Sequence, residues 1–205
     1  MQHRVESFSD MIMGFSVALL GLTLTIPAHT IELFHAPAWI IIYGWTFGII
    51  VVVWSLHQRL FSAYFEPTPL ALGLNFLMLA LLVLLCFFVQ VFGHMHQPAD
   101  RSLALLAYIV IFALIFLIMA ALYTIGLRAH WSRLSADQRS RGVATAVRIF
   151  CMLVGLTAGL ALSRFDPESL TFALGVLFGT LLGRAVMPAV RARFPALRAT
   201  TEPAP

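Results

Sequence analysis

One carboxylate lies at the start of the first long apolar run of this chain. Asp10 directly precedes a run that begins at Met11 and stops at Pro27. A charged Asp near the end of a membrane-length helix must find a partner, reach the interface or take up a proton. Arg4, six residues upstream, can supply the counter-charge. The alternative is that Asp10, together with Ser9, only caps the helix in the headgroup layer.

The next two apolar runs also carry polar side chains. His57 follows Trp54 by three residues, so both lie on one face of a helix. A histidine at that depth needs a hydrogen-bond partner, and we predict that it joins Arg4 and Asp10; alternatively it reaches the headgroups. Asn75, in the third run, is predicted to bond across helices. An acid and an imidazole within a membrane are also the groups of a proton relay.

The other reactive side chains form no comparable pattern. Cys86 and Cys151 both fall in apolar runs, where a thiol behaves as a small core residue. His94 and His96 flank a loop with Asp100, but two histidines on a loop are weak evidence for a metal. No Ser, His and Asp set, HExxH motif or paired carboxylates appears. We therefore expect neither enzyme activity nor a metal or cofactor site.

The helix that positions Asp10 has three stripes when its residues are spaced at about 100°. The apolar stripe holds Phe8, Phe15, Leu19, Leu22 and Ile26. The hydroxyl stripe recurs every seven residues, at Ser9, Ser16 and Thr23. The small-residue stripe holds Asp10 with Gly14, Ala18 and Gly21.

The hydroxyl stripe and the apolar stripe each have two interpretations, and the small-residue stripe has one. The hydroxyls either replace the hydration of an ion in a water-filled path or bond back to carbonyls of their own helix. The apolar stripe either faces lipid or core, or forms a hydrophobic constriction that gates by dewetting. The small residues suit close approach of a neighbouring helix.

The composition is that of an integral membrane protein. Hydrophobic residues make up 60% of the chain and charged residues only 11%, with a mean hydropathy of +0.92, whereas soluble domains carry about 25% charge. Six apolar runs are long enough to span a bilayer: 7–27, 37–61, 70–93, 102–127, 143–163 and 169–188. We predict an all-α fold, with one six-helix transmembrane domain over 1–188 and a cytoplasmic, disordered tail over 189–205.

The basic residues define the predicted orientation. All 13 are arginines, and only Arg101 and Arg164 fall on one side if the six spans alternate. The other eleven fall on the opposite side, so both termini are predicted to be cytoplasmic. Because the arginines are scattered over separate loops and the tail, they do not indicate a nucleic-acid partner. The expected surroundings are the lipid bilayer.

The motif that contains Asp10 resembles a family signature. Arg4-Val5-Glu6-Ser7-Phe8-Ser9-Asp10, followed by a long apolar helix, resembles the RxxxFSD signature of the transmembrane protein 175 family of potassium channels, in its prokaryotic single-repeat form. Trp54 and His57 are similar to the family's Trp-x-x-His, and Asn75 to its Asn-Leu pattern. The resemblance is specific over the first ninety residues and loose over the rest.

This resemblance implies a multi-pass protein of a prokaryotic plasma membrane that forms a homotetramer, in which four first helices line a central potassium pore. It places a hydrophobic constriction at Phe15, with further layers at Leu19 and Leu22, and it makes Arg4, Asp10 and His57 a brace of the pore helix. The family commonly has Ile or Leu at the constriction and Thr three positions later, where this chain has Phe15 and Ala18. A layer without hydroxyls is expected to discriminate poorly between cations.

We therefore predict a passive cation channel with potassium as the permeant ion. Phe15, Ala18, Leu19 and Leu22 form its pore and gate, and a structural network holds the pore helix: Arg4, Phe8, Ser9, Asp10, Trp54, His57 and Asn75. The alternative is a proton-coupled transporter that uses Asp10 and His57. Saturable transport without ion current would favour it, whereas the lack of inverted repeats and broken helix pairs speaks against it.

Overall fold

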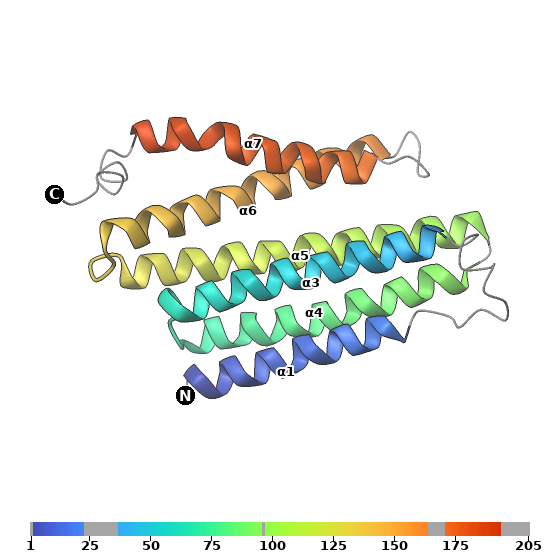
Figure 1. Cartoon of the computed structure of the whole chain (residues 1–205), viewed down its shortest axis with the longest axis horizontal. Coiled ribbons are helices and arrows are strands. Elements are labelled where there is room, and N and C mark those ends of the chain that lie inside the picture. The colour runs from blue at the N-terminus through green and yellow to red at the C-terminus, as the bar shows by residue number, and fades with distance from the viewer. Residues whose placement is uncertain (1, 23–36, 96, 164–170, 194–205) are drawn as a thin grey trace. The chain divides into compact units, whose positions relative to one another are not determined.

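The computed structural model describes residues 2–22, 37–95, 97–163 and 171–193, and everything regular in them is helical. Figure 1 shows the six helices of these residues, which confirm the predicted all-α class. Their bounds are α1 Gln2–Gly21, α3 Pro37–Ala63, α4 Pro69–His94, α5 Pro98–His130, α6 Ala136–Ser163 and α7 Thr171–Arg193.

Local sequence signals explain where several helices begin. Pro37, Pro69 and Pro98 each occupy the first helical position, where the missing N–H costs nothing. Before α6, the Ser135 and Gln138 side chains each accept a hydrogen bond from the other residue's backbone N–H, at 3.2 and 3.0 Å. This reciprocal pair is a capping box, which fixes the start of α6.

Several helix bounds differ from the predicted spans, and three of the differences have a local cause or lie at the edge of the described residues. The helix α6 begins at Ala136 rather than 143, because the capping box starts it ahead of the apolar run. The helix α7 continues to Arg193 with Pro188 inside it, past the predicted end of the apolar span at 188; one proline removes only one backbone hydrogen bond. The helix α1 begins at Gln2, and residues 23–27 of its predicted span lie outside the described residues.

Four helices of the described chain are long and apolar enough to cross a membrane, over Tyr43–Ala63, Pro69–Phe92, Ala99–His130 and Ala136–Ala161. The described apolar part of α7 is shorter, Leu177–Pro188. Together with the composition, these spans make the protein a multi-pass membrane protein.

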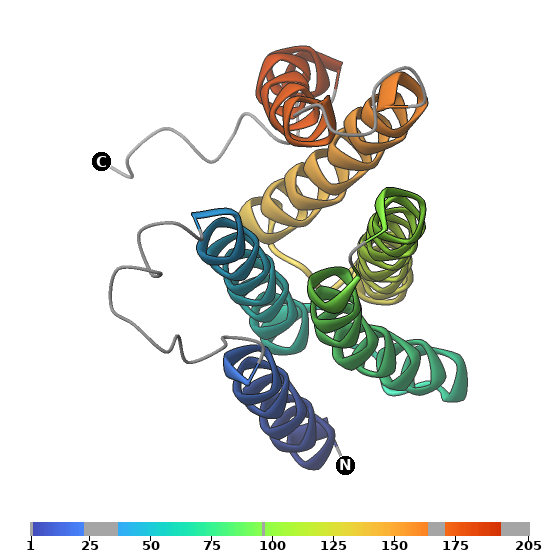
Figure 2. The same cartoon turned by 90° about the vertical axis from the view of Figure 1, so that its right-hand side faces the viewer.

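The chain divides into two compact units. The first contains residues 1–59 and 72–115, and the second contains 60–71 and 116–205. In the first unit α1 runs along α3 and α4, as both views show (Figures 1 and 2). Met13 and Leu20 of α1 are buried there with Val53 of α3 and Met78 of α4. A polar pair, Thr46 and Tyr108, joins α3 to α5 with 3.0 Å between its hydroxyl oxygens.

In the second unit α6 and α7 form a close antiparallel pair. Glycines face each other across the contact, because a Cβ at Gly155 would lie 2.6 Å from the Gly179 Cα, and a Cβ at Gly179 would lie 2.6 Å from the Cys151 carbonyl oxygen. Only residues without a side chain allow two helix backbones to approach this closely. The glycines therefore set the register of α6 on α7.

Candidate functional site

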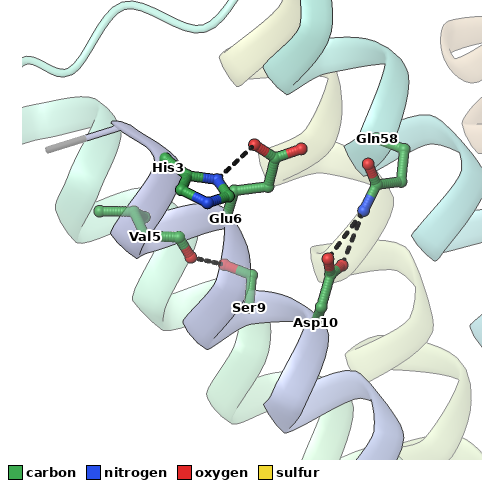
Figure 3. A network of polar contacts seen from close by, with 6 residues as sticks. All are labelled: His3, Val5, Glu6, Ser9, Asp10 and Gln58. Atoms are coloured by element: carbon green, nitrogen blue, oxygen red, sulfur yellow. Dashed lines mark hydrogen bonds and ion pairs between the residues drawn. The ribbon is translucent and has the colours of Figure 1, made fainter.

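The carboxylate of Asp10 is held by two side chains of α3. Gln58 Nε2 donates to both oxygens, at 2.8 and 3.0 Å, and Trp54 Nε1 donates to Oδ1 at 3.1 Å. Figure 3 shows the Gln58 amide directed at the two oxygens of Asp10. Trp54 and Gln58 are four residues apart, so one face of α3 supplies both donors. Hydrogen bonds to a charged acceptor are stronger than neutral ones, and they tie α1 to α3.

A second set of hydrogen bonds connects three helices beside Asp10. The His57 Nε2 of α3 lies 3.0 Å from Asn75 Oδ1 of α4, and Asn75 Nδ2 donates to the Ser9 hydroxyl of α1 at 3.1 Å. Ser9 in turn donates to the Val5 carbonyl oxygen at 2.8 Å (Figure 3). His57, Asn75 and Ser9 are all fully buried.

The directions of these hydrogen bonds determine that the His57 ring nitrogen facing Asn75 carries a hydrogen. The Val5 carbonyl can only accept, so the Ser9 hydroxyl donates to it and accepts from the Asn75 amide. The Asn75 oxygen then faces His57, whose Nε2 must carry a hydrogen. This histidine acts as a donor that positions Asn75.

Two members of the predicted cluster of Arg4, Asp10 and His57 form hydrogen bonds with other side chains. Arg4 is exposed, Asp10 accepts hydrogen bonds from Trp54 and Gln58, and His57 bonds to Asn75. Six residues along a helix correspond to about 240° of rotation, so Arg4 lies on a different side of α1 from Asp10. The acid is held by neutral donors, and His57 belongs to the neighbouring set of bonds.

The inward face of α1 contains the hydroxyls. Ser9 and Ser16 have no exposed surface, and each hydroxyl donates to a carbonyl four residues earlier, that of Val5 or Ile12. The structure thus favours the back-bonding interpretation over a water-filled path for these two residues. Thr23, the third member of the stripe, lies outside the described residues.

The outward face of α1 is apolar. Phe8, Met11, Phe15 and Leu22 are exposed, with Phe15 at 62% and Leu22 at 77%. Ala18 is exposed on the same face, whereas Leu19 is half-buried. Phe8 also packs edge-on against Phe76 of α4, with ring centroids 5.8 Å apart. Ile26, predicted for this stripe, lies outside the described residues.

Two residues of this arrangement, Gln58 and Cys86, were missed by sequence reasoning, whereas Gln90 was expected either to bond across helices or to face the interface. Two side chains of α4 donate to backbone carbonyls of α1: Cys86 Sγ to Ser16 at 3.3 Å, and Gln90 Nε2 to Leu19 at 3.5 Å. The available signal was spacing, since Cys86 follows Asn75 by eleven residues, or about three helical turns, and Gln90 by one more turn. All three donors therefore lie on one face of α4.

Among the described residues no group of three His, Cys, Asp or Glu side chains could hold a metal ion. His94 Nδ1 donates to the Gln90 carbonyl oxygen at 2.8 Å, and His96 lies outside the described residues.

Buried polar side chains that bond between apolar helices are typical of membrane helix bundles. Residues 4–86 match a family model, TMEM175, described as endosomal/lysosomal potassium channel TMEM175. The matched residues contain every predicted site residue. The family resemblance inferred from the sequence is confirmed for this segment. The family consists of ion-transport proteins and is not a class of enzyme. No curated protein and no solved structure matches the chain significantly.

Proposed function

We propose that this protein is a passive cation channel, with potassium as the permeant ion, in which four copies of α1 surround a pore. The observation that carries the proposal is the orientation of α1. Its polar side chains at Ser9, Asp10 and Ser16 are directed to α3, α4 or its own backbone, while Phe8 and Phe15 face outward. The family match over residues 4–86 includes this helix and its supports.

The pore belongs between copies of the chain rather than inside one. The inward side of α1 is filled by Met13 and Leu20, which are 2% and 0% exposed. Four copies related by a closed rotation would instead bring the outward faces of α1 together around the axis. Phe15 would then form a hydrophobic constriction, with Ala18 and Leu22 lining the layers beyond it and Leu19 beside them.

Asp10 has a supporting role in this proposal. Both of its oxygens accept hydrogen bonds from α3, so its charge is used to hold α1. Arg4, which is exposed, is free to meet a group of another copy. We expect modest selectivity, because Phe15 and Ala18 offer no oxygen to replace the hydration shell of potassium. The proposed location is the plasma membrane, with both termini cytoplasmic.

Flux into liposomes tests the proposal. Purified protein is reconstituted, and potassium and sodium entry are measured with and without a proton gradient. We expect potassium entry above that of empty liposomes, driven by its own gradient alone. Saturable entry that requires a proton gradient would instead support a transporter using Asp10 and His57. Folded protein that carries no flux would exclude the channel.

A further inference from the structure

Two arginines lie inside apolar segments of the second unit. Arg148 falls within the candidate span Ala136–Ala161 of α6, and Arg184 falls within the apolar part of α7, Leu177–Pro188. Both are exposed on the described chain. An arginine inside a membrane segment is costly unless its charge is compensated, so a pair of them calls for an explanation.

The close packing of α6 on α7 places the two arginines at one level. A Cβ at Gly183, the residue before Arg184, would lie 3.4 Å from the Cα of Arg148 and 3.5 Å from its Cγ. The Arg148 side chain therefore leaves α6 at a point that faces Gly183 of α7, the neighbour of Arg184 in sequence. These distances are ordinary van der Waals contacts, so α6 and α7 pack directly against each other beside the two arginines.

The surroundings of the pair indicate its depth. On one side lie exposed apolar residues, Phe150 of α6 at 65% and Leu181 of α7 at 52%. On the other side α6 leads back to its polar first turns, which contain Asp137 and Arg141. Long arginine side chains at such a boundary direct their charged ends to the headgroup layer. By the distribution of arginines, this layer is the cytoplasmic one.

Described acids expected on that side are already engaged. Asp10 accepts from Gln58, Glu66 lies 3.0 Å from His130, and Asp137 pairs with Arg141. Glu6 lies 4.0 Å from His3 on α1. No acid among the described residues pairs with Arg148 or Arg184. Their counter-charge must therefore come from outside this described part of the chain.

We propose that Arg148 and Arg184 together bind the phosphate of an anionic phospholipid from the cytoplasmic leaflet. Two guanidinium groups offer paired N–H donors whose geometry matches phosphate oxygens. Basic sites between transmembrane helices on this side of a bilayer bind anionic headgroups. A zwitterionic lipid fits less well, because its ammonium group would lie beside two positive charges.

Lipid titration of the full chain tests this site. Delipidated protein in detergent is titrated with phosphatidylglycerol or phosphatidylcholine, and the shift in unfolding midpoint gives an apparent Kd. We expect wild type to bind phosphatidylglycerol about tenfold more tightly than phosphatidylcholine. The double variant Arg148→Gln/Arg184→Gln should lose this preference. Arg133→Gln, which removes an exposed arginine from the α5–α6 loop, should keep it.

Three results would overturn the proposal. The first is an unchanged preference in Arg148→Gln/Arg184→Gln. The second is an equal midpoint shift with inorganic phosphate alone, which would make this a site for free anions. The third concerns folding: if Arg148→Gln/Arg184→Gln and Arg148→Lys/Arg184→Lys both fail to fold with phosphatidylglycerol present, the two arginines are required by the fold itself and not by a lipid. None of these measurements needs ion flux, so the outcome is separate from that of the channel proposal.

Discussion

At the scale of single residues, the two buried serines of α1 differ in their hydrogen-bond partners. Ser9 and Ser16 are seven residues apart, fully buried, and both donate to their own helix. Of the two, Ser9 also accepts a hydrogen bond from the Asn75 side chain. A sequence shows the two serines as equivalent members of one stripe. Their difference arises from Asn75, which is 66 residues away from Ser9.

Replacing the two serines separately should show this difference. Ser9→Ala leaves the buried Asn75 amide without its acceptor and should lower the free energy of unfolding by about 1–3 kcal/mol. Ser16→Ala removes a bond from its own helix carbonyl and should cost less than about 1 kcal/mol. Unfolding in detergent followed by circular dichroism provides the comparison. Equal losses for the two variants would mean that Asn75 does not depend on Ser9.

Gln58 provides a second test at this scale. Gln58→Leu keeps most of the side-chain volume but removes two of the three bonds to the Asp10 carboxylate. We expect a loss of about 1–3 kcal/mol, because a part-buried charge is left with one neutral donor. In the Asp10→Asn background the same change should cost less. A double-mutant cycle measures this coupling, and additive effects would show that the two residues do not interact.

At the scale of helices, the sequence predicted the elements better than their ends. Apolar runs locate all six described helices, since backbone groups in a bilayer must bond within a helix. The early start of α6 was readable from Ser135 and Gln138, whose spacing is that of a capping box. The continuation of α7 through Pro188 was not readable, because a single proline only disfavours a helix.

The close packing of α6 against α7 depends on glycines, which have no side chain. Gly179→Ala puts a Cβ 2.6 Å from the Cys151 carbonyl oxygen and 2.8 Å from the Met152 Cα, so the two backbones must separate. We expect a loss of about 1–3 kcal/mol. Gly73→Ala in α4 is the control, because its Cβ meets nothing within 4 Å. That variant should be neutral or slightly stabilised by helix propensity. Thermal unfolding compares them; equal stability would contradict the close contact.

At the scale of the whole molecule, the orientation of α1 connects the residue contacts to the proposed assembly. The family resemblance predicted a supporting role for Asp10, with Arg4 and His57 as its partners. Choosing Trp54 and Gln58 as its hydrogen-bond donors required knowing how α3 lies on α1. In the proposed tetramer, the outward face of α1, which is exposed in a single chain, lines the pore.

Assembly should therefore depend on Asp10. Asp10→Asn weakens the bonds that hold α1 to α3, so the outward face is presented less uniformly to other copies. Light scattering in detergent should give four copies for the wild type and a larger share of smaller species for Asp10→Asn. Intact tetramers with altered potassium over sodium flux would contradict this role, because they would mean that Asp10 meets the ion.

The most direct test of the channel proposal compares two phenylalanines of nearly equal exposure. Phe15 of α1 is 62% exposed and Phe150 of α6 is 65% exposed, but only Phe15 is assigned to the constriction. Potassium flux into liposomes is measured for Phe15→Ala, Phe150→Ala and the wild type. A wider and less dewetted constriction should raise the flux of Phe15→Ala several-fold, while Phe150→Ala should match the wild type. Unchanged flux in Phe15→Ala, or an equal change in both variants, would contradict a pore lined by α1.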